Sequence, residues 1–234
     1  MNWIIVGGLA IGALIVGANG TGQERIRRIT PRIPIAPVRI DTVCVTRGDL
    51  RPNGGVNVPT FRAVLPGTSG EAMAFAFHFR GRSREARALA SGAVRRQIGL
   101  KLRAANGCNL VYVMWRLDPS PQVEVSIKVN PGLRTHRECG AGGYTKIRPA
   151  FHGTVPMPRV GERHQMQAEI VGDELLAWID GQLVWRGALP PQVRSIQGPS
   201  GIRSDNVAYY IEGLSAPLGR YGMGQSGCVA DGED

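Results

Sequence analysis

The sequence predicts an all-β protein built as a two-sheet antiparallel β-sandwich. Short segments that alternate apolar and polar residues recur along most of the chain, and a period of two is the pattern of a strand with one buried face. The 32 glycines and 16 prolines are spread over many short interruptions between these segments, as the turns of an all-β chain require. With 234 residues, 43% of them hydrophobic, one sandwich can bury a full core without a second domain.

The first strands are expected in the middle of the chain. Residues 73–80 place three phenylalanines on one face, which we interpret as core, and residues 97–102 predict a half-buried strand. Residues 110–117 are apolar on both faces and predict a central strand, and residues 123–128 alternate again. The basic stretch after the phenylalanines predicts either a short helix over Ser83–Ala90, which Ser83 could cap, or a solvated connection, which we favour.

The clearest strand and turn signals lie between His164 and Leu214. Residues 164–170 alternate, and Asp180-Gly181 then separates two apolar runs. Asp-Gly in this position predicts a hairpin, because a type I′ turn needs a positive φ at both central residues. A turn over Gly201–Asn206 and a closing strand over Val207–Leu214 complete the predicted meander.

This part of the chain resembles the concanavalin A-like (laminin G-like) jelly-roll superfamily, in particular the bacterial branch with the 3-keto-disaccharide hydrolase type domains. The resemblance is carried by two segments, WIDGQLVW and GIRSDN, and by these residues in them: Trp178, Asp180, Gly181, Leu183, Gly201, Arg203, Ser204, Asp205 and Asn206. It implies a jelly-roll sandwich, which we expect over residues 41–220 and with one concave face.

The residues before this domain predict a leader and a linker. Residues 1–18 contain an apolar run of signal-peptide length, short for a membrane span, with small residues that suit cleavage before Asn19. The run has no basic residue before it and three arginines after it, which disfavours simple export, so an uncleaved membrane anchor or a mis-called start codon remains an alternative. Residues 19–40 are rich in proline and arginine and predict an extended linker, and residues 221–234 are expected to form a C-terminal tail.

Four cysteines predict two disulfides and an extracytoplasmic location, whether periplasmic, cell-surface or secreted. The first and last strands of a jelly roll commonly lie side by side, so the resemblance favours Cys44 with Cys228 and leaves Cys108 with Cys139. A zinc site is the alternative, because His136 lies three residues before Cys139, but the sequence has no C-x-x-C motif.

The formal net charge is +10 and is carried mostly by arginine. A basic balance of this size permits contact with nucleic acid, anionic lipid or acidic polysaccharide. The aromatic residues do not interleave with arginines in an RNA-binding pattern, so no nucleic-acid partner is predicted.

The irregular stretch Asn130–Pro149 is the predicted leading loop of a ligand site, since loops carry function on a rigid scaffold. Aromatic planes can cover the apolar face of a sugar while arginine donates to its hydroxyls or carboxylates. Tryptophans are more often core, so only an exposed one would support stacking. The predicted ligand-binding residues are Arg134, His136, Tyr144, Trp178, Arg203 and Asp205.

No catalytic residue and no cofactor are predicted. The alternating acidic strand motif of glucanases, a G-x-S-x-G elbow and phosphate-binding loops are all missing from the sequence. Calcium would need several loop oxygens. Asp180, Asp205 and Asn206 offer such oxygens, but turn chemistry explains them equally well. We therefore expect an exported, non-catalytic carbohydrate-binding module. The alternatives are a hydrolase of the keto-disaccharide type, implied by the resemblance alone, and an adhesion component that binds other proteins.

Overall fold

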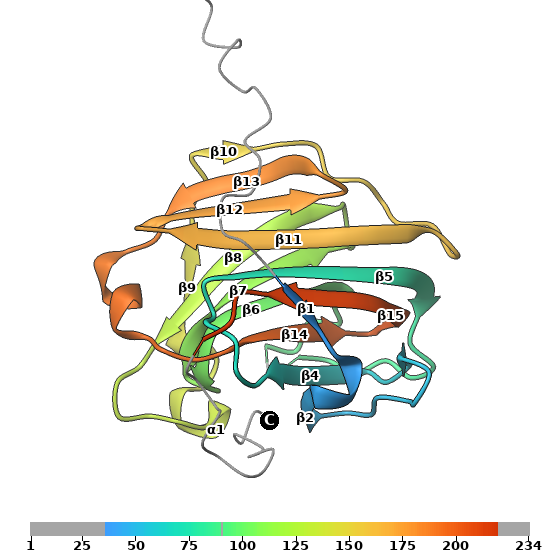
Figure 1. Cartoon of the computed structure of the whole chain (residues 1–234), viewed down its shortest axis with the longest axis horizontal. Helices are drawn as coiled ribbons and strands as arrows, with labels where there is room; N and C mark the ends of the chain where they lie inside the picture. Colours follow the sequence, from blue (N-terminus) through green and yellow to red (C-terminus); the bar gives the residue numbers. More distant parts are fainter. Residues whose placement is uncertain (1–35, 90, 220–234) are drawn as a thin grey trace, which may run out of the picture.

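The computed structural model describes residues 36–89 and 91–219, and its strands form two antiparallel sheets that pack as a sandwich (Figure 1). The eight-stranded sheet has the order β1-β15-β5-β11-β12-β13-β10, with β3 beside β15. Its strands are β1 (Ala36–Val38), β3 (Gly55–Val56), β5 (Ala72–Arg82), β10 (Phe151–His152), β11 (Arg163–Val171), β12 (Glu174–Ile179), β13 (Gln182–Ala188) and β15 (Val207–Ala216). The predicted all-β sandwich is confirmed.

The seven-stranded sheet has the order β2-β4-β14-β6-β7-β8-β9. Its strands are β2 (Cys44–Arg47), β4 (Thr60–Leu65), β6 (Gln97–Asn106), β7 (Asn109–Arg116), β8 (Gln122–Val129), β9 (Tyr144–Ile147) and β14 (Ser200–Asp205). The helices of the described residues are single turns: α1 (His136–Cys139) and the 3-10 turns η1 (Ile40–Thr42), η2 (Ala141–Gly143) and η3 (Pro191–Ser195). None of the described helices is long and apolar enough to cross a membrane.

The core lies between the sheets and follows the alternation of the strands. The three phenylalanines of β5 are buried and face the apolar residues of β7, where the ring of Trp115 packs edge-on against Phe77 at 6.2 Å. Tyr209 of β15 closes the cluster, with its ring 5.6 Å from that of Phe75. These are the core positions that the alternation predicts.

The predicted hairpin at Asp180-Gly181 is confirmed. Both residues have positive φ, 50° and 76°, and Ile179 of β12 pairs with Gln182 of β13 across the turn. The Asp180 carboxylate also accepts a hydrogen bond of 2.8 Å from the backbone N–H of Gln165, which fixes the turn to β11.

The predicted turn over Gly201–Asn206 is wrong, because this segment is the strand β14 within the seven-stranded sheet, between β4 and β6. A Cβ on Gly201 would lie 2.3 Å from the carbonyl oxygen of Ala63, so glycine allows the close approach of β4. Only Asn206, with φ of 56°, turns the chain into β15. Of the polar residues that suggested a turn, Asp205 instead accepts hydrogen bonds from Arg62 on β4 and Gln97 on β6.

Two further predictions between the phenylalanines and β7 are corrected. Residues 83–89 form no helix, because Ser83 donates to the carbonyl of Glu85 instead of capping a helix, and the backbone N–H of Arg84 bonds the side chain of Asn57. The segment is the mostly exposed connection that we favoured. Strand β6 is buried on both faces, since even Lys101 is only 2% exposed.

The sandwich begins earlier than the predicted boundary at residue 41. Ala36 of β1 pairs with Ala216 of β15, so the first and last strands lie side by side and residues 36–40 belong to the domain. Cys44 is disulfide-bonded. Its predicted partner Cys228, the leader over residues 1–18, residues 19–35 of the linker and the tail over residues 221–234 lie outside the described residues.

Candidate functional site

A hollow of about 500 Å³ lies on the outer face of the seven-stranded sheet. Its floor consists of side chains that alternate with core residues along the strands, such as Arg62 on β4, Arg203 on β14, Tyr112 on β7 and Ser126 on β8. One wall is the connection between β5 and β6, and the other is the turn at Gly107 with α1. We refer to this site as the outer-face hollow.

The first wall is held over the floor by one buried side chain. Asn206 is 2% exposed, and its Oδ1 accepts a hydrogen bond of 2.8 Å from the backbone N–H of Arg87. Its Nδ2 donates to the backbone carbonyls of Arg87 and Arg95, at 2.9 and 2.8 Å. Because these bonds use the backbone of the connection, they position it whatever side chains it carries, and both arginines line the hollow.

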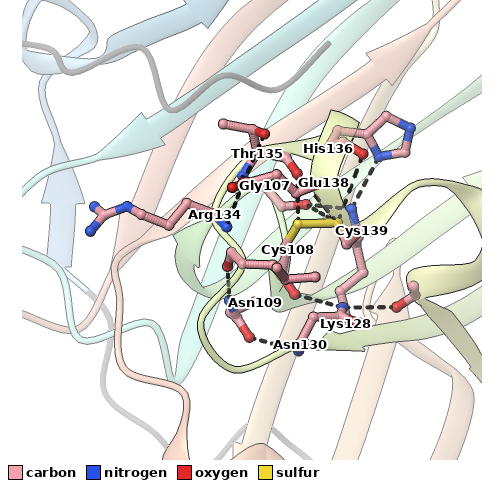
Figure 2. Close-up of a disulfide and its surroundings, with 12 residues drawn as sticks. Gly107, Cys108, Asn109, Lys128, Asn130, Arg134, Thr135, His136, Glu138 and Cys139 are labelled. Carbon is pink, nitrogen blue, oxygen red and sulfur yellow. Dashed lines mark hydrogen bonds between the residues drawn. A yellow bond between two sulfur atoms is a disulfide. The ribbon is translucent and has the colours of Figure 1, made fainter.

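The second wall is held by the predicted disulfide between Cys108 and Cys139, which is confirmed with an S–S distance of 2.05 Å (Figure 2). It joins the turn between β6 and β7 to α1 and excludes the zinc alternative at these cysteines. Buried Lys128 donates to the carbonyl of Gly107 and lies with its Nζ 3.1 Å from His136 Nδ1. Together, the disulfide and this lysine fix where the His136 ring lies.

Buried ion pairs lie at the centre of the floor. Asp205 is fully buried and accepts hydrogen bonds from Arg62 Nη2 at 2.7 Å, Gln97 Nε2 at 2.6 Å and Arg203 Nε at 3.0 Å. Burial alone would raise the pKa of the Asp205 carboxyl, but the guanidinium groups of Arg203 and Arg62 more than reverse this, so the pKa lies well below its ordinary value. Two guanidinium groups therefore share one carboxylate, and the cluster carries an excess positive charge.

Two tyrosines extend the floor towards α1. The rings of Tyr112 and Tyr144 lie 5.9 Å apart and nearly parallel, at 22°. The guanidinium of Arg203 lies 4.7 Å over the Tyr112 ring and donates to the Tyr144 hydroxyl at 3.3 Å. The Lys128 ammonium lies 4.6 Å from the centre of the Tyr144 ring. Cations thus lie against both rings, and a ligand here meets guanidinium and hydroxyl groups as well as aromatic edges.

The described residues that line the hollow include one carboxylate, that of Glu124. It accepts a hydrogen bond from Arg116, and Lys146 and Arg95 lie 3.4 and 3.9 Å from it. A retaining or inverting glycosidase needs two carboxylates placed on either side of the scissile bond. Asp205 cannot serve as the second, since three donors already occupy it. The arrangement suits binding by hydrogen bonds and charge.

The structure brings four of the six predicted ligand-binding residues to one place. His136, Tyr144 and Arg203 line the outer-face hollow, and Asp205 lies beneath it. Arg134 is exposed, does not line the hollow, and directs its guanidinium away from His136 in Figure 2.

Trp178 lies apart from this group. It is 2% exposed, on β12 of the other sheet, so the structure does not bring it to the hollow. Trp115 and Trp185, the other tryptophans among the described residues, are also buried, in the core. The exposed tryptophan that sugar stacking would require is therefore not found among the described residues.

Sequence reasoning missed several residues of the hollow, namely Arg62, Gln97, Tyr112, Glu124 and Asn206. The only signal for Tyr112 was its strand, and an apolar pattern on both faces hides which face is the site. The basic stretch that contains Arg87 and Arg95 is evident in the sequence, but its place beside the floor depends on Asn206.

The candidate calcium ligands do not converge. Asp180 lies 2.8 Å from the ring nitrogen Nδ1 of His164, Asp205 is held by arginines, and the side chain of Asn206 bonds backbone groups of the wall. Within residues 36–89 and 91–219, no three histidine, cysteine, aspartate or glutamate side chains are grouped so that they could hold a metal ion.

Comparison with known proteins gives structural likenesses only. No protein-family model matches the chain, and no curated protein matches it by sequence. The carbohydrate-binding module CBM66 from Bacillus subtilis matches with a TM-score of 0.51 and 13% identity, over 75% of this chain and 95% of that one.

Two other solved structures match less well. A tetrameric galectin from the ball sponge Cinachyrella sp. matches with a TM-score of 0.41 and 14% identity, over 68% of this chain and 100% of that one. The Crh5 transglycosylase in complex with NAG matches with a TM-score of 0.42 and 12% identity, over 79% and 83% of the two chains. The likeness to CBM66 shows the fold: the chain is a jelly-roll β-sandwich, the fold that the sequence resemblance implied.

Proposed function

We propose that this protein binds carbohydrate in the outer-face hollow and does so without catalysis. The observation that carries the proposal is the hollow itself, in which hydrogen-bonding groups of Arg203, Tyr144 and His136 converge on a rigid sheet. Its volume, about 500 Å³, lies within the range of small-molecule sites. The structure most like this chain among those described above is named as a carbohydrate-binding module, which supports the same ligand class.

The alternatives have less support. A hydrolase of the keto-disaccharide type would need a pair of available carboxylates or a metal, and the one carboxylate among the described lining residues, Glu124, is ion-paired. An adhesion component would suit a flat sheet face, whereas this face is hollowed between two fixed walls. An extracytoplasmic location is part of the proposal, and the disulfide between Cys108 and Cys139 supports it, because such bonds persist in oxidising compartments.

A glycan array probed with the oxidised protein, with and without calcium, tests the proposal. Ser126 lies on β8 between Tyr112 and Lys146 in the sheet, so Ser126→Trp places a bulky side chain on the floor of the hollow. Ser195→Trp, at an exposed position in η3, is the matched control.

We expect Ser126→Trp to weaken binding of the array hits about tenfold or more, and Ser195→Trp to leave it unchanged. Titration calorimetry measures both affinities, and the thermal midpoint of each variant shows that it is folded. A blank array at high protein concentration, or equal affinities of the two variants, would refute the proposal.

A further inference from the structure

The outer-face hollow has an excess of positive charge. Apart from Arg47, its described lining includes five cationic side chains, Arg62, Arg87, Arg95, Lys146 and Arg203, against the single carboxylate Glu124. Even with Asp205 beneath the floor counted, five cations face two carboxylates. A neutral ligand would leave this charge without a counterpart in a partly enclosed site, where the field of the guanidinium groups is concentrated.

The donors on the floor are only partly used. A guanidinium group has five N–H donors. Arg203 directs two hydrogen bonds to described partners, one to Asp205 and one to Tyr144. The carboxylate of Glu124 is shared by Arg116, Lys146 and Arg95, so these three cations together have one negative charge at Glu124.

The first wall adds a more accessible cation. Arg87 lies in the exposed connection and is held by its backbone alone, and its side chain forms no ion pair with any of the described residues. It therefore leaves a guanidinium group at the rim for an incoming anion.

The neutral hydrogen-bonding groups among these cations further restrict the class of ligand that fits the hollow. The amide of Gln97, the hydroxyls of Ser126 and Tyr144 and the imidazole of His136 line the same hollow and suit a ligand that carries hydroxyl groups beside its negative charge. Tyr112 is only 3% exposed, so it offers no open ring face on which a nucleobase could stack, as single-stranded nucleic acids require. The mixture of cations and neutral hydrogen-bonding groups favours a charged sugar.

We infer that the outer-face hollow selects acidic saccharides, with their carboxylate or sulfate groups received by its arginines. This inference rests on the proposed function and adds the ligand class. Guanidinium groups match carboxylate and sulfate oxygens through paired hydrogen bonds, and that of Arg203 is fixed in orientation by Asp205 and Tyr144. A uronate or sulfated unit therefore meets donors that are already in place.

The test compares oligosaccharides that differ only in charge. Each sugar is titrated into the whole oxidised protein by calorimetry at fixed ionic strength. The affinity of trigalacturonate is compared with that of its methyl ester, and the affinity of a heparin tetrasaccharide with that of its desulfated form. We expect each acidic probe that binds to bind about tenfold tighter than its neutral counterpart, and at least one of the two to bind.

Charge-matched variants separate the hollow from the general basic surface. Arg87→Gln with Arg95→Gln removes two charges from the wall while the backbone bonds to Asn206 remain. Arg80→Gln with Arg82→Gln removes two charges from exposed positions on β5 of the other sheet. We expect the first pair of changes to weaken acidic binding about tenfold and the second pair less than twofold.

The possible outcomes are distinguishable. Equal losses in the two double variants would attribute the binding to general surface charge and overturn the inference. If neutral sugars bound as tightly as acidic ones, and Ser126→Trp weakened their binding, the inference of acidic ligands would be overturned while the proposed function would stand. If a single-stranded oligonucleotide bound the hollow more tightly than every saccharide, nucleic acid would replace carbohydrate as the ligand, and both the proposed function and this inference would be overturned. If no saccharide bound, on the array or by calorimetry, both would be refuted.

Discussion

The buried cluster under the outer-face hollow makes a strong prediction about stability. Asp205→Asn keeps the shape of the side chain but removes the charge that Arg62 and Arg203 share, and it leaves one acceptor oxygen where there were two. Removing one partner of a buried ion pair costs about 3–5 kcal/mol, because the remaining charge is desolvated without compensation. Both guanidinium groups lose their partner here, so we expect a loss at the upper end of that range.

Urea unfolding of the oxidised protein, followed by tryptophan fluorescence, measures this loss of unfolding free energy. In a domain of this size, each kcal/mol lost lowers the thermal midpoint by roughly 2–4 °C. The matched control is Asp173→Asn, which breaks an ion pair with Arg194 at the surface. Exposed pairs contribute little, so we expect no measurable change in that variant. The reasoning would be wrong if Asp205→Asn were as stable as the parent protein.

The same pair of proteins gives a pH dependence with a defined sign. The pKa of Asp205 in the folded state lies below its ordinary value of about 3.9, so folding favours the ionised carboxylate. Its contribution is fully present above the unfolded-state pKa and is lost as the pH falls through the folded-state pKa. We therefore expect the stability gap between parent and Asp205→Asn to be constant above about pH 5 and to narrow as the solution is acidified. A gap that widened in acid would contradict this assignment.

Three further predictions concern the scaffold, each measured as a free energy of unfolding in urea. Replacing Cys108 and Cys139 by serine should cost about 3–4 kcal/mol, because the disulfide closes a loop across 31 residues of sequence. An unchanged stability would show that the bond does not restrict the unfolded chain. Gly181→Ala should cost about 1 kcal/mol since its φ is +76°, whereas Gly213→Ala, with open space and no positive φ, should be neutral; equal effects would contradict the role of the turn. Tyr209→Phe should cost about 1 kcal/mol because the buried hydroxyl accepts a hydrogen bond from Ser204 at 3.2 Å, and a gain in stability would argue against that bond.

The parts of the fold that local patterns predicted correctly are those that depend on residues close together in the sequence. The alternation of β5 and the Asp180-Gly181 turn each depend on residues adjacent in sequence, and both are found as expected. The segment Gly201–Asn206 shows where such reasoning stops. Its polar residues favour a turn in isolation, but Asp205 is bound by Arg62 and Gln97, which are 143 and 108 residues away in the sequence. Tertiary partners override the local preference there.

The site was only partly predictable for a related reason. Arg134 and His136 are two residues apart in one loop, and the sequence gives them equal standing, yet only His136 lines the hollow. The difference arises from Lys128 on β8 and from the disulfide, which fix the histidine. Trp178 shows the converse, since a residue type suited to sugar stacking lies buried in the other sheet. Composition identifies candidate ligand residues, but the pairing of strands decides which of them meet.

Removing the Asp205 carboxylate distinguishes two explanations of anion binding in the hollow, net positive charge and the fixed orientation of the guanidinium groups. If the hollow attracted anions by net charge alone, removal of this carboxylate would raise the positive charge and tighten binding. If the ligand instead requires guanidinium groups in fixed orientations, the same removal frees Arg62 and Arg203 from the partner that orients them, and binding weakens. The cluster is buried and has hydrogen bonds to three different strands, β4, β6 and β14, which is an arrangement for holding side chains in place. We therefore expect Asp205→Asn, assayed below its unfolding midpoint, to bind acidic saccharides more weakly than the parent protein despite its higher positive charge.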